Sequence, residues 1–133
     1  MDKYLEELKS KGLSIIALQD KKRYESYEKG INPIILRIEE NDLFFLDAIV
    51  YDKIIGKAAA MLLIRSGVKE VHAVTMSKAA KKVLDYYEVK NTCEELVDKI
   101  INRKGTDICP MEKAVAKTND LLEAYEVLKT KVI

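Results

Sequence analysis

The sequence has few of the residues that build metal centres and disulfide scaffolds. Its 133 residues include two cysteines, Cys93 and Cys109, and one histidine, His72. Two widely spaced thiols fit neither a disulfide framework nor a tetrathiolate zinc site, and one histidine does not make a metal cluster. We therefore expect reduced thiols, a hydrogen-bonded structural histidine, and neither a metal nor another cofactor.

The chain also lacks an excess of one charge and a long uncharged apolar run. Lysine and arginine number 23 against 22 aspartates and glutamates, which gives a formal charge of +1. This balance supplies no field that would draw nucleic acid to the protein. No stretch approaches the ~18 apolar residues of a membrane span, and the first residues lack the apolar core of a signal peptide. We expect a cytoplasmic protein with neither nucleic acid nor membrane as a partner, and leave assembly into a homo-oligomer open.

The sequence does contain enough apolar material for a folded domain. Hydrophobic residues make up 48% and charged residues 34%, a balance typical of globular rather than disordered chains. At roughly 100 to 200 residues per domain, the length predicts a single domain spanning residues 1–133.

The order of apolar and polar segments predicts an α/β fold. We expect a helix over 2–9, a hairpin over 13–28, a helix over 32–41, a strand over 43–50, a helix over 57–65, a strand over 68–76, a helix over 78–87, and a long helix from Cys109 with a kink near 118–119. Residues 93–102 fit a capped helix or a strand, and we favour the strand. Alternation of strand and helix implies a right-handed crossover and a sheet between helices.

The first candidate site is the polar stretch between two strongly apolar segments, which contains Asp52, Gly56 and Lys57. It leaves a predicted central strand and enters a helix, where exposed N–H groups and a glycine let an anion approach the backbone. It is not a Walker loop, because Tyr51 and Ala58 stand where that motif needs glycine and serine or threonine. The alternative is a plain turn in which Gly56 permits close packing and Lys57 is solvated.

The second candidate site precedes the last predicted helix. Pro110 fits the first helical position, which makes Cys109 the N-cap and places Glu112 third, so that cysteine replaces the serine or threonine of a capping box. A helix N-terminus and the nearby Arg103 both favour a thiolate, so Cys109 is a candidate nucleophile. The alternative is a small buried hydrophobe, which is also how we interpret Cys93.

Four ordered blocks, residues 52–60, 76–80, 101–103 and 109–112, resemble an uncharacterised prokaryotic family of small deaminase-like proteins. The resemblance implies the cytidine deaminase-like fold, a three-layer α/β/α sandwich with a central mixed sheet. Zinc deaminases need His or Cys two residues before Glu at one helix start and Pro-Cys-x-x-Cys at the next. Here these helix starts read Gly-Lys-Ala-Ala from Gly56 and Met-Ser-Lys-Ala from Met76, so zinc-dependent deamination is not expected.

Two functional hypotheses from different classes follow. In the first, which we favour, the domain binds a small nucleotide-like or other anionic ligand without zinc, through Asp52, Gly56, Lys57, Ser77, Arg103 and Glu112. In the second, it is a metal-independent enzyme or redox-responsive protein with Cys109 as the reactive thiol. There Lys57 or Arg103 would stabilise negative charge, and Asp52 or Glu112 would handle a proton. A purely structural subunit is a third option.

Overall fold

The computed structural model describes residues 2–101, 105 and 107–131. The helices and strands of the described chain are, in order, α1 (Lys3–Lys11), β1 (Ile15–Gln19), β2 (Lys22–Ser26), α2 (Asn32–Glu40), β3 (Ile49–Ile55), α3 (Lys57–Arg65), β4 (Glu70–Ser77), α4 (Lys78–Tyr86), β5 (Lys90–Val97), α5 (Pro110–Val115) and α6 (Leu121–Lys129). The chain therefore has the mixed α/β architecture that its alternating pattern predicts.

A five-stranded mixed sheet forms the centre of the molecule. Its strand order is β2-β1-β3-β4-β5, and β1 runs antiparallel to both of its neighbours. The strands β3, β4 and β5 are parallel to one another. Their carboxyl ends therefore meet at one edge of the sheet, which is the usual position for a ligand site in sheets of this kind.

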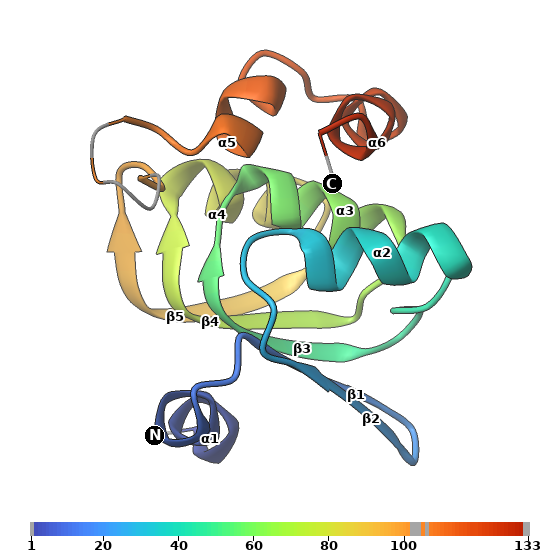
Figure 1. Cartoon of the computed structure of the whole chain (residues 1–133), viewed down its shortest axis with the longest axis vertical. Helices are drawn as coiled ribbons and strands as arrows, with labels where there is room; N and C mark the ends of the chain where they lie inside the picture. The colour runs from blue at the N-terminus through green and yellow to red at the C-terminus, as the bar shows by residue number, and fades with distance from the viewer. Residues whose placement is uncertain (1, 102–104, 106, 132–133) are drawn as a thin grey trace.

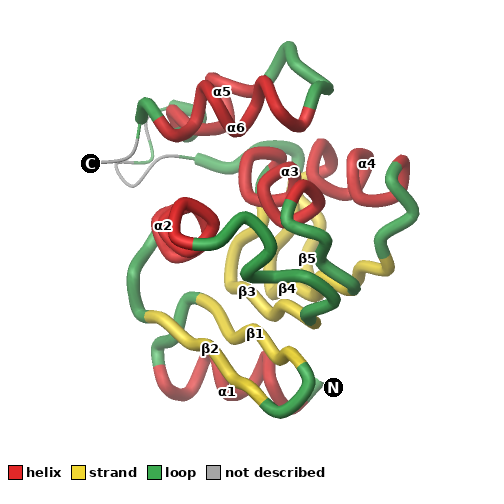
Figure 2. The backbone as a smooth tube through the Cα atoms, turned by 90° about the vertical axis from the view of Figure 1, so that its right-hand side faces the viewer, coloured by secondary structure: helices red, strands yellow, loops and turns green. Residues whose placement is uncertain are grey.

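Helices cover both faces of the sheet. Figure 1 shows α1 on one face and α2, α3 and α4 on the other. Figure 2 shows α5 and α6 beyond α3, on the side away from the sheet. The central helix α3 is consequently enclosed, and its residues 58–63 are all buried. None of the helices in the described ranges has both the length and the apolar character needed to cross a membrane.

Local capping signals define several helix ends. Asp2 accepts the N–H of Tyr4 at the start of α1, and Gly12 ends that helix with a φ of 71°. Ser77 accepts the N–H of Ala80 over 3.0 Å and so begins α4. These contacts satisfy backbone groups that a helix leaves unpaired at its ends.

The predicted strand over residues 43–50 is wrong. Residues 43–48 form consecutive turns, in which the N–H of Leu46 bonds to Leu43 O and that of Ala48 to Phe45 O. Phe45 is fully buried whereas Leu43 and Leu46 are exposed, and Asp47 adopts a φ of 58°. The turns thus place Phe45 and Ala48 in the core, and the central strand begins later, at Ile49.

The second half of the chain differs from expectation at two further points. Residues 90–97 form β5, so the strand that we favoured for 93–102 exists but begins earlier and ends at Val97. The single C-terminal helix is two helices, α5 and α6, separated at residues 116–120. Asp120 starts the second of these helices, because its carboxylate accepts the N–H groups of Leu122 and Glu123.

Candidate functional site

A cavity of about 810 Å³ lies at the edge where the three parallel strands end. Lys57 follows β3, Ser77 ends β4, and Asp98 follows β5, and all three line the cavity. Further walls come from α4 and α5. The predicted ligand residues Lys57, Ser77 and Glu112 therefore share one cavity, although they come from three separate parts of the sequence.

Glu112 of α5 occupies the amino end of α3. Its two carboxylate oxygens accept the backbone N–H groups of Lys57 and Ala58 over 2.7 and 2.8 Å. Burial raises the pKa of Glu112, and the two N–H bonds oppose that rise. The position that we assigned to a ligand anion is thus taken by a carboxylate of the chain itself.

Gly56 makes this contact possible. It has an extended backbone, with φ −102° and ψ −178°, and it precedes α3 without any side chain to cap the helix. A Cβ atom at this position would lie 2.5 Å from Cδ and Oε1 of Glu112. The glycine therefore serves close approach, as predicted, but the group that approaches is Glu112.

Lys57 and Lys82 bring two positive charges to the same cavity. Lys57 is partly buried, and its Nζ donates to the carbonyl oxygen of Ala116 over 3.3 Å. Burial lowers the pKa of Lys57, Glu112 opposes this, and the charge of Lys82 lowers it further. Like charges held together in a partly desolvated place favour the arrival of an anion.

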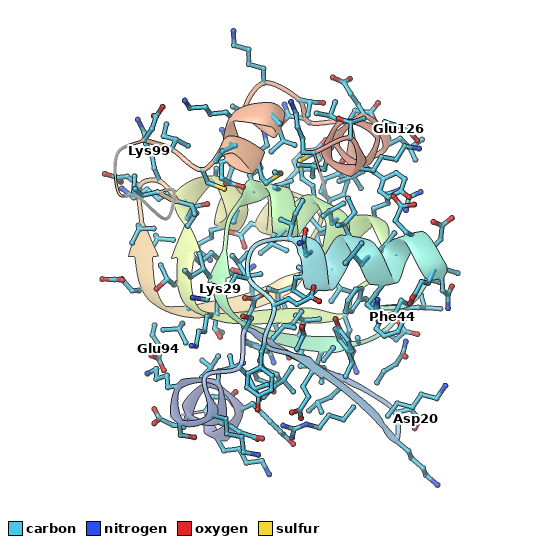
Figure 3. The ribbon with its side chains drawn as sticks, viewed as in Figure 1. Asp20, Lys29, Phe44, Glu94, Lys99 and Glu126 are labelled. Atoms are coloured by element: carbon cyan, nitrogen blue, oxygen red, sulfur yellow. The ribbon has the colours of Figure 1, made fainter. Side chains whose placement is uncertain are left out.

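Lys99 adds a third ammonium group to the cavity wall. It lies just beyond β5, on the side of the sheet that carries α5, and at the opposite end of the molecule from Asp20 (Figure 3). Among the residues that the structure describes, none of Lys57, Lys82 and Lys99 is within salt-bridge distance of a carboxylate. Asp98, which also lines the cavity, is paired with Lys78 at 2.7 Å.

Ser77 is almost fully buried at the base of the cavity. Its hydroxyl oxygen accepts the N–H of Ala80, so the side chain has a structural role as the N-cap of α4. The hydroxyl proton is not used in that bond, and a hydroxyl can accept and donate at once. Ser77 is therefore able to cap the helix and donate to a ligand.

Asp52 does not lie where the sequence placed it. It is inside β3 rather than after a strand, and its neighbours across the sheet are Ile15 of β1 and Ala73 of β4. The side chain is 6% exposed and accepts the N–H of Ile54 over 3.2 Å. Burial raises the pKa of Asp52 to about 8, so the carboxyl is mainly protonated at neutral pH. Asp52 is not among the described residues that line the cavity.

Cys109 is the N-cap residue of α5, as predicted, and Pro110 is the first residue of that helix. The thiol is partly exposed and makes no capping bond, while the Cys109 N–H donates to Ile100 O over 2.9 Å. The thiol is absent from the described lining of the cavity. Arg103, which we predicted to act beside it, lies outside the described residues.

Cys93 and His72 have the structural surroundings expected of them. Cys93 packs against the main core from β5. His72 is buried, and its two ring nitrogens lie 2.6 Å from Thr92 Oγ1 and 2.9 Å from Glu70 Oε1. Within the described ranges, no group of three or more His, Cys, Asp or Glu residues is placed to hold a metal ion.

One wall of the cavity was missed by the sequence analysis. The residues Ala79, Lys82, Val83 and Tyr86 of α4 all line it. They are spaced i, i+3, i+4 and i+7, which places them on one helical face. This spacing was available as a signal, but a lysine and a tyrosine on an amphipathic helix are more often solvated or packed than aimed at a ligand.

The fold and the cavity define a mixed α/β protein with a ligand-sized cavity at the carboxyl ends of its parallel strands. The chain belongs to the TM1506 family, described as a domain of unknown function (DUF1893), whose family model matches residues 3–132. A crystal structure of a DUF1893 family protein (TM1506) from Thermotoga maritima is similar to it, with a TM-score of 0.86 and 28% sequence identity over 99% of this chain and 92% of that one. The comparison with curated proteins gave no match. The expected membership of an uncharacterised family is confirmed.

Proposed function

We propose that the cavity binds a small anionic molecule, nucleotide-like or other, without the help of zinc. The observation that carries this proposal is the set of three cavity lysines, Lys57, Lys82 and Lys99, none of which has a carboxylate partner in the described part of the chain. The two acidic residues in the wall make their closest polar contacts elsewhere, Glu112 with backbone N–H groups of α3 and Asp98 with Lys78. The charge of Glu112 offsets part of that of Lys57, so that the three lysines still outnumber the one carboxylate without a lysine partner.

The geometry separates two roles that the sequence analysis had combined. The amino end of α3 binds Glu112 and so fixes α5 as one wall of the cavity. The incoming anion contacts the ammonium groups and the Ser77 hydroxyl instead of the helix N–H groups. A positively charged, partly enclosed cavity raises the local concentration of anions and strengthens each contact relative to open solvent.

We further infer that this site stands on a cytidine deaminase-like, three-layer α/β/α domain. The mixed sheet with α1 on one face and α2, α3 and α4 on the other supports that assignment, and α5 with α6 would be an addition to it (Figures 1 and 2). The helix starts at the strand ends carry Lys57 and Ser77 in place of zinc ligands. Cation and hydroxyl chemistry of this kind binds and orients an anion but does not activate water as zinc does.

The alternative function, a reactive thiol at Cys109, has less support from the geometry. Neither Cys109 nor Asp52 lines the cavity among the described residues, and Asp52 is buried in the sheet. A nucleophile and its base must come within hydrogen-bond reach of each other and of the substrate. We therefore keep the thiol as a test of reactivity rather than as the main proposal.

The experiment is a thermal-shift titration with inorganic phosphate at constant ionic strength. An anion that binds only the folded protein raises the melting temperature by mass action. We expect a rise for the wild type and its loss in the Lys57→Ala/Lys82→Ala double variant. Lys21→Ala is the matched control, because Lys21 is exposed in the β1–β2 turn and is absent from the cavity lining. That turn and α5 lie at opposite ends of the molecule (Figure 1).

Two results would contradict the proposal. The first is a wild-type melting temperature that does not respond to phosphate beyond the effect of equal ionic strength in sodium chloride. The second is a phosphate response that survives in the double variant as fully as in Lys21→Ala. Circular dichroism of each variant shows that the comparison is between folded proteins.

A further inference from the structure

Two tyrosines stand at the far end of the same cavity wall. Tyr86 and Tyr87, at the carboxyl end of α4, both line the cavity. Tyr86 is 78% exposed and Tyr87 is 38% exposed. A large aromatic side chain left this open at a cavity contributes little to the core, so its ring surface is available for another molecule.

The two rings are held in a defined arrangement. Their centroids are 5.1 Å apart and their planes are inclined by 82°. The Tyr87 hydroxyl also donates to Asn119 O across the cavity, over 3.4 Å. Because the rings meet edge to face, they do not cover each other as a parallel stack would. The contact with Tyr87 therefore leaves most of the Tyr86 side chain uncovered.

The aromatic end and the cationic end are one helical turn apart. Lys82 and Tyr86 are spaced i and i+4 on α4, which puts their Cβ atoms about 6 Å from each other. Both face the cavity, and Lys57 lies close enough to Lys82 for the two charges to interact. A ligand that satisfies both ends carries its negative charge within a few bonds of a flat ring.

We propose that the ligand of this cavity is an aromatic anion, a flat ring bearing a phosphate or carboxylate, with the ring against Tyr86 and the anion against Lys82 and Lys57. This inference rests on the proposed function and narrows it from anions in general to those that carry a ring. Two sources share this chemistry, nucleotides and simple aryl phosphates, and the test distinguishes them.

The test compares four phosphate monoesters by isothermal titration calorimetry on the full chain. Phenyl phosphate and adenosine monophosphate carry an aromatic ring, whereas methyl phosphate and ribose 5-phosphate have similar charge and no aromatic ring. We expect the two aromatic compounds to bind at least about fivefold more tightly than their non-aromatic partners, which is the low end of the cost of removing a stacking aromatic. Tighter binding of adenosine monophosphate than of phenyl phosphate would identify the ligand class as nucleotides. Tighter binding of phenyl phosphate would identify it as simple aryl phosphates.

Variants assign the effect to the tyrosine. Tyr86→Ala should remove the preference for aromatic compounds, and Tyr86→Phe should keep it, because stacking needs the ring and not the hydroxyl. Tyr27→Ala is the control, since Tyr27 is similarly exposed, at 62%, but does not line the cavity. The exposure of Tyr86 means that its substitution leaves the core untouched.

The outcomes separate this inference from the one on which it rests. Equal binding of aromatic and non-aromatic phosphates, lost in Lys57→Ala/Lys82→Ala, overturns the aromatic inference and leaves the anion site in place. A preference for aromatic compounds that persists in Tyr86→Ala also overturns it. Absence of binding for all four compounds overturns both proposals.

Discussion

Replacing Gly56 with alanine should destabilise the protein chiefly through Glu112. The extended backbone of Gly56 is open to any residue, so alanine causes no strain there. The new Cβ would instead lie 2.5 Å from Cδ and Oε1 of Glu112, which is closer than atoms that are not bonded to each other approach. Glu112 must move, and the N–H groups of Lys57 and Ala58 lose the acceptor that caps α3.

The size of the effect follows from the bonds that are lost. Loss of a helix cap costs about 0.5–2 kcal/mol, and hydrogen bonds to a charged group lie at or above the upper end of that range. Alanine restricts the unfolded chain and returns about 0.4–1 kcal/mol. That return, like the lower preference for alanine at an N-cap, is the same whether or not Glu112 is present. The difference between the two backgrounds should therefore be about 1.5–2 kcal/mol.

The measurement is a double-mutant cycle of urea-induced unfolding at pH 7. It compares the wild type, Gly56→Ala, Glu112→Ala and the double variant. Gly12→Ala is the control, because Gly12 has a φ of 71° and open space around its missing Cβ. It should cost the same with and without Glu112. If Gly56→Ala changes the free energy of unfolding equally in both backgrounds, within about 0.5 kcal/mol, the substitution does not act by displacing Glu112 from the start of α3.

Three further predictions concern Asp52, the thiols and zinc. The folded-state pKa of Asp52 is raised from 3.8 to about 8, so the stabilisation that comes from its protonated carboxyl is complete below pH 3.8 and is lost as the pH rises towards 8. Between pH 5 and pH 7 the free energy of unfolding of Asp52→Asn should therefore rise relative to that of the wild type by about 2–3 kcal/mol. A difference in urea unfolding that does not change with pH would refute this. Cys109 should alkylate faster than Cys93 in native protein treated with iodoacetamide, since it stands at a helix start; equal slow labelling by mass spectrometry would remove the thiol hypothesis. Elemental analysis should find no stoichiometric zinc, whereas about one zinc per chain, lost in Cys109→Ala, would overturn the metal-free interpretation.

Helix boundaries were predictable because their signals are local. Ser77 before α4, Gly12 after α1 and Pro33 at the start of α2 each act within one turn of the helix that they define. The β1–β2 hairpin is equally local, and it forms as expected. Signals of this kind depend on neighbouring residues in the sequence, so one sequence is enough to detect them.

The errors occurred where burial depends on distant parts of the chain. The run over residues 43–50 is apolar enough for a central strand, yet Leu43 and Leu46 are exposed in turns. The real strand contains Asp52, a residue that sequence patterns assign to turns. Only the packing of β3 between β1 and β4 makes a buried carboxyl acceptable there, with its proton retained to avoid an isolated charge.

The candidate site was predictable in position but not in its contacts. Strand ends leading into Lys57 and Ser77 pointed to the edge of the sheet at which the cavity lies. No local pattern linked Glu112 to α3, because the bond from Ala58 N spans 54 residues. The sequence therefore named three residues that share the cavity, Lys57, Ser77 and Glu112, but it missed the wall from α4 and misassigned what Glu112 binds.

The hydrogen bonds between α3 and Glu112 also determine when α3 can be capped during translation. A ribosome produces the chain from its amino end, so β3, α3 and β4 are complete well before residue 112 exists. Until then the enclosed central helix has free N–H groups at its start and lacks α5 and α6 against its outer side. The nascent protein therefore acquires its final stability only when the last two helices have been made. In a chain that ends before Pro110, the side of α3 that α5 and α6 cover would be exposed to solvent and would favour aggregation.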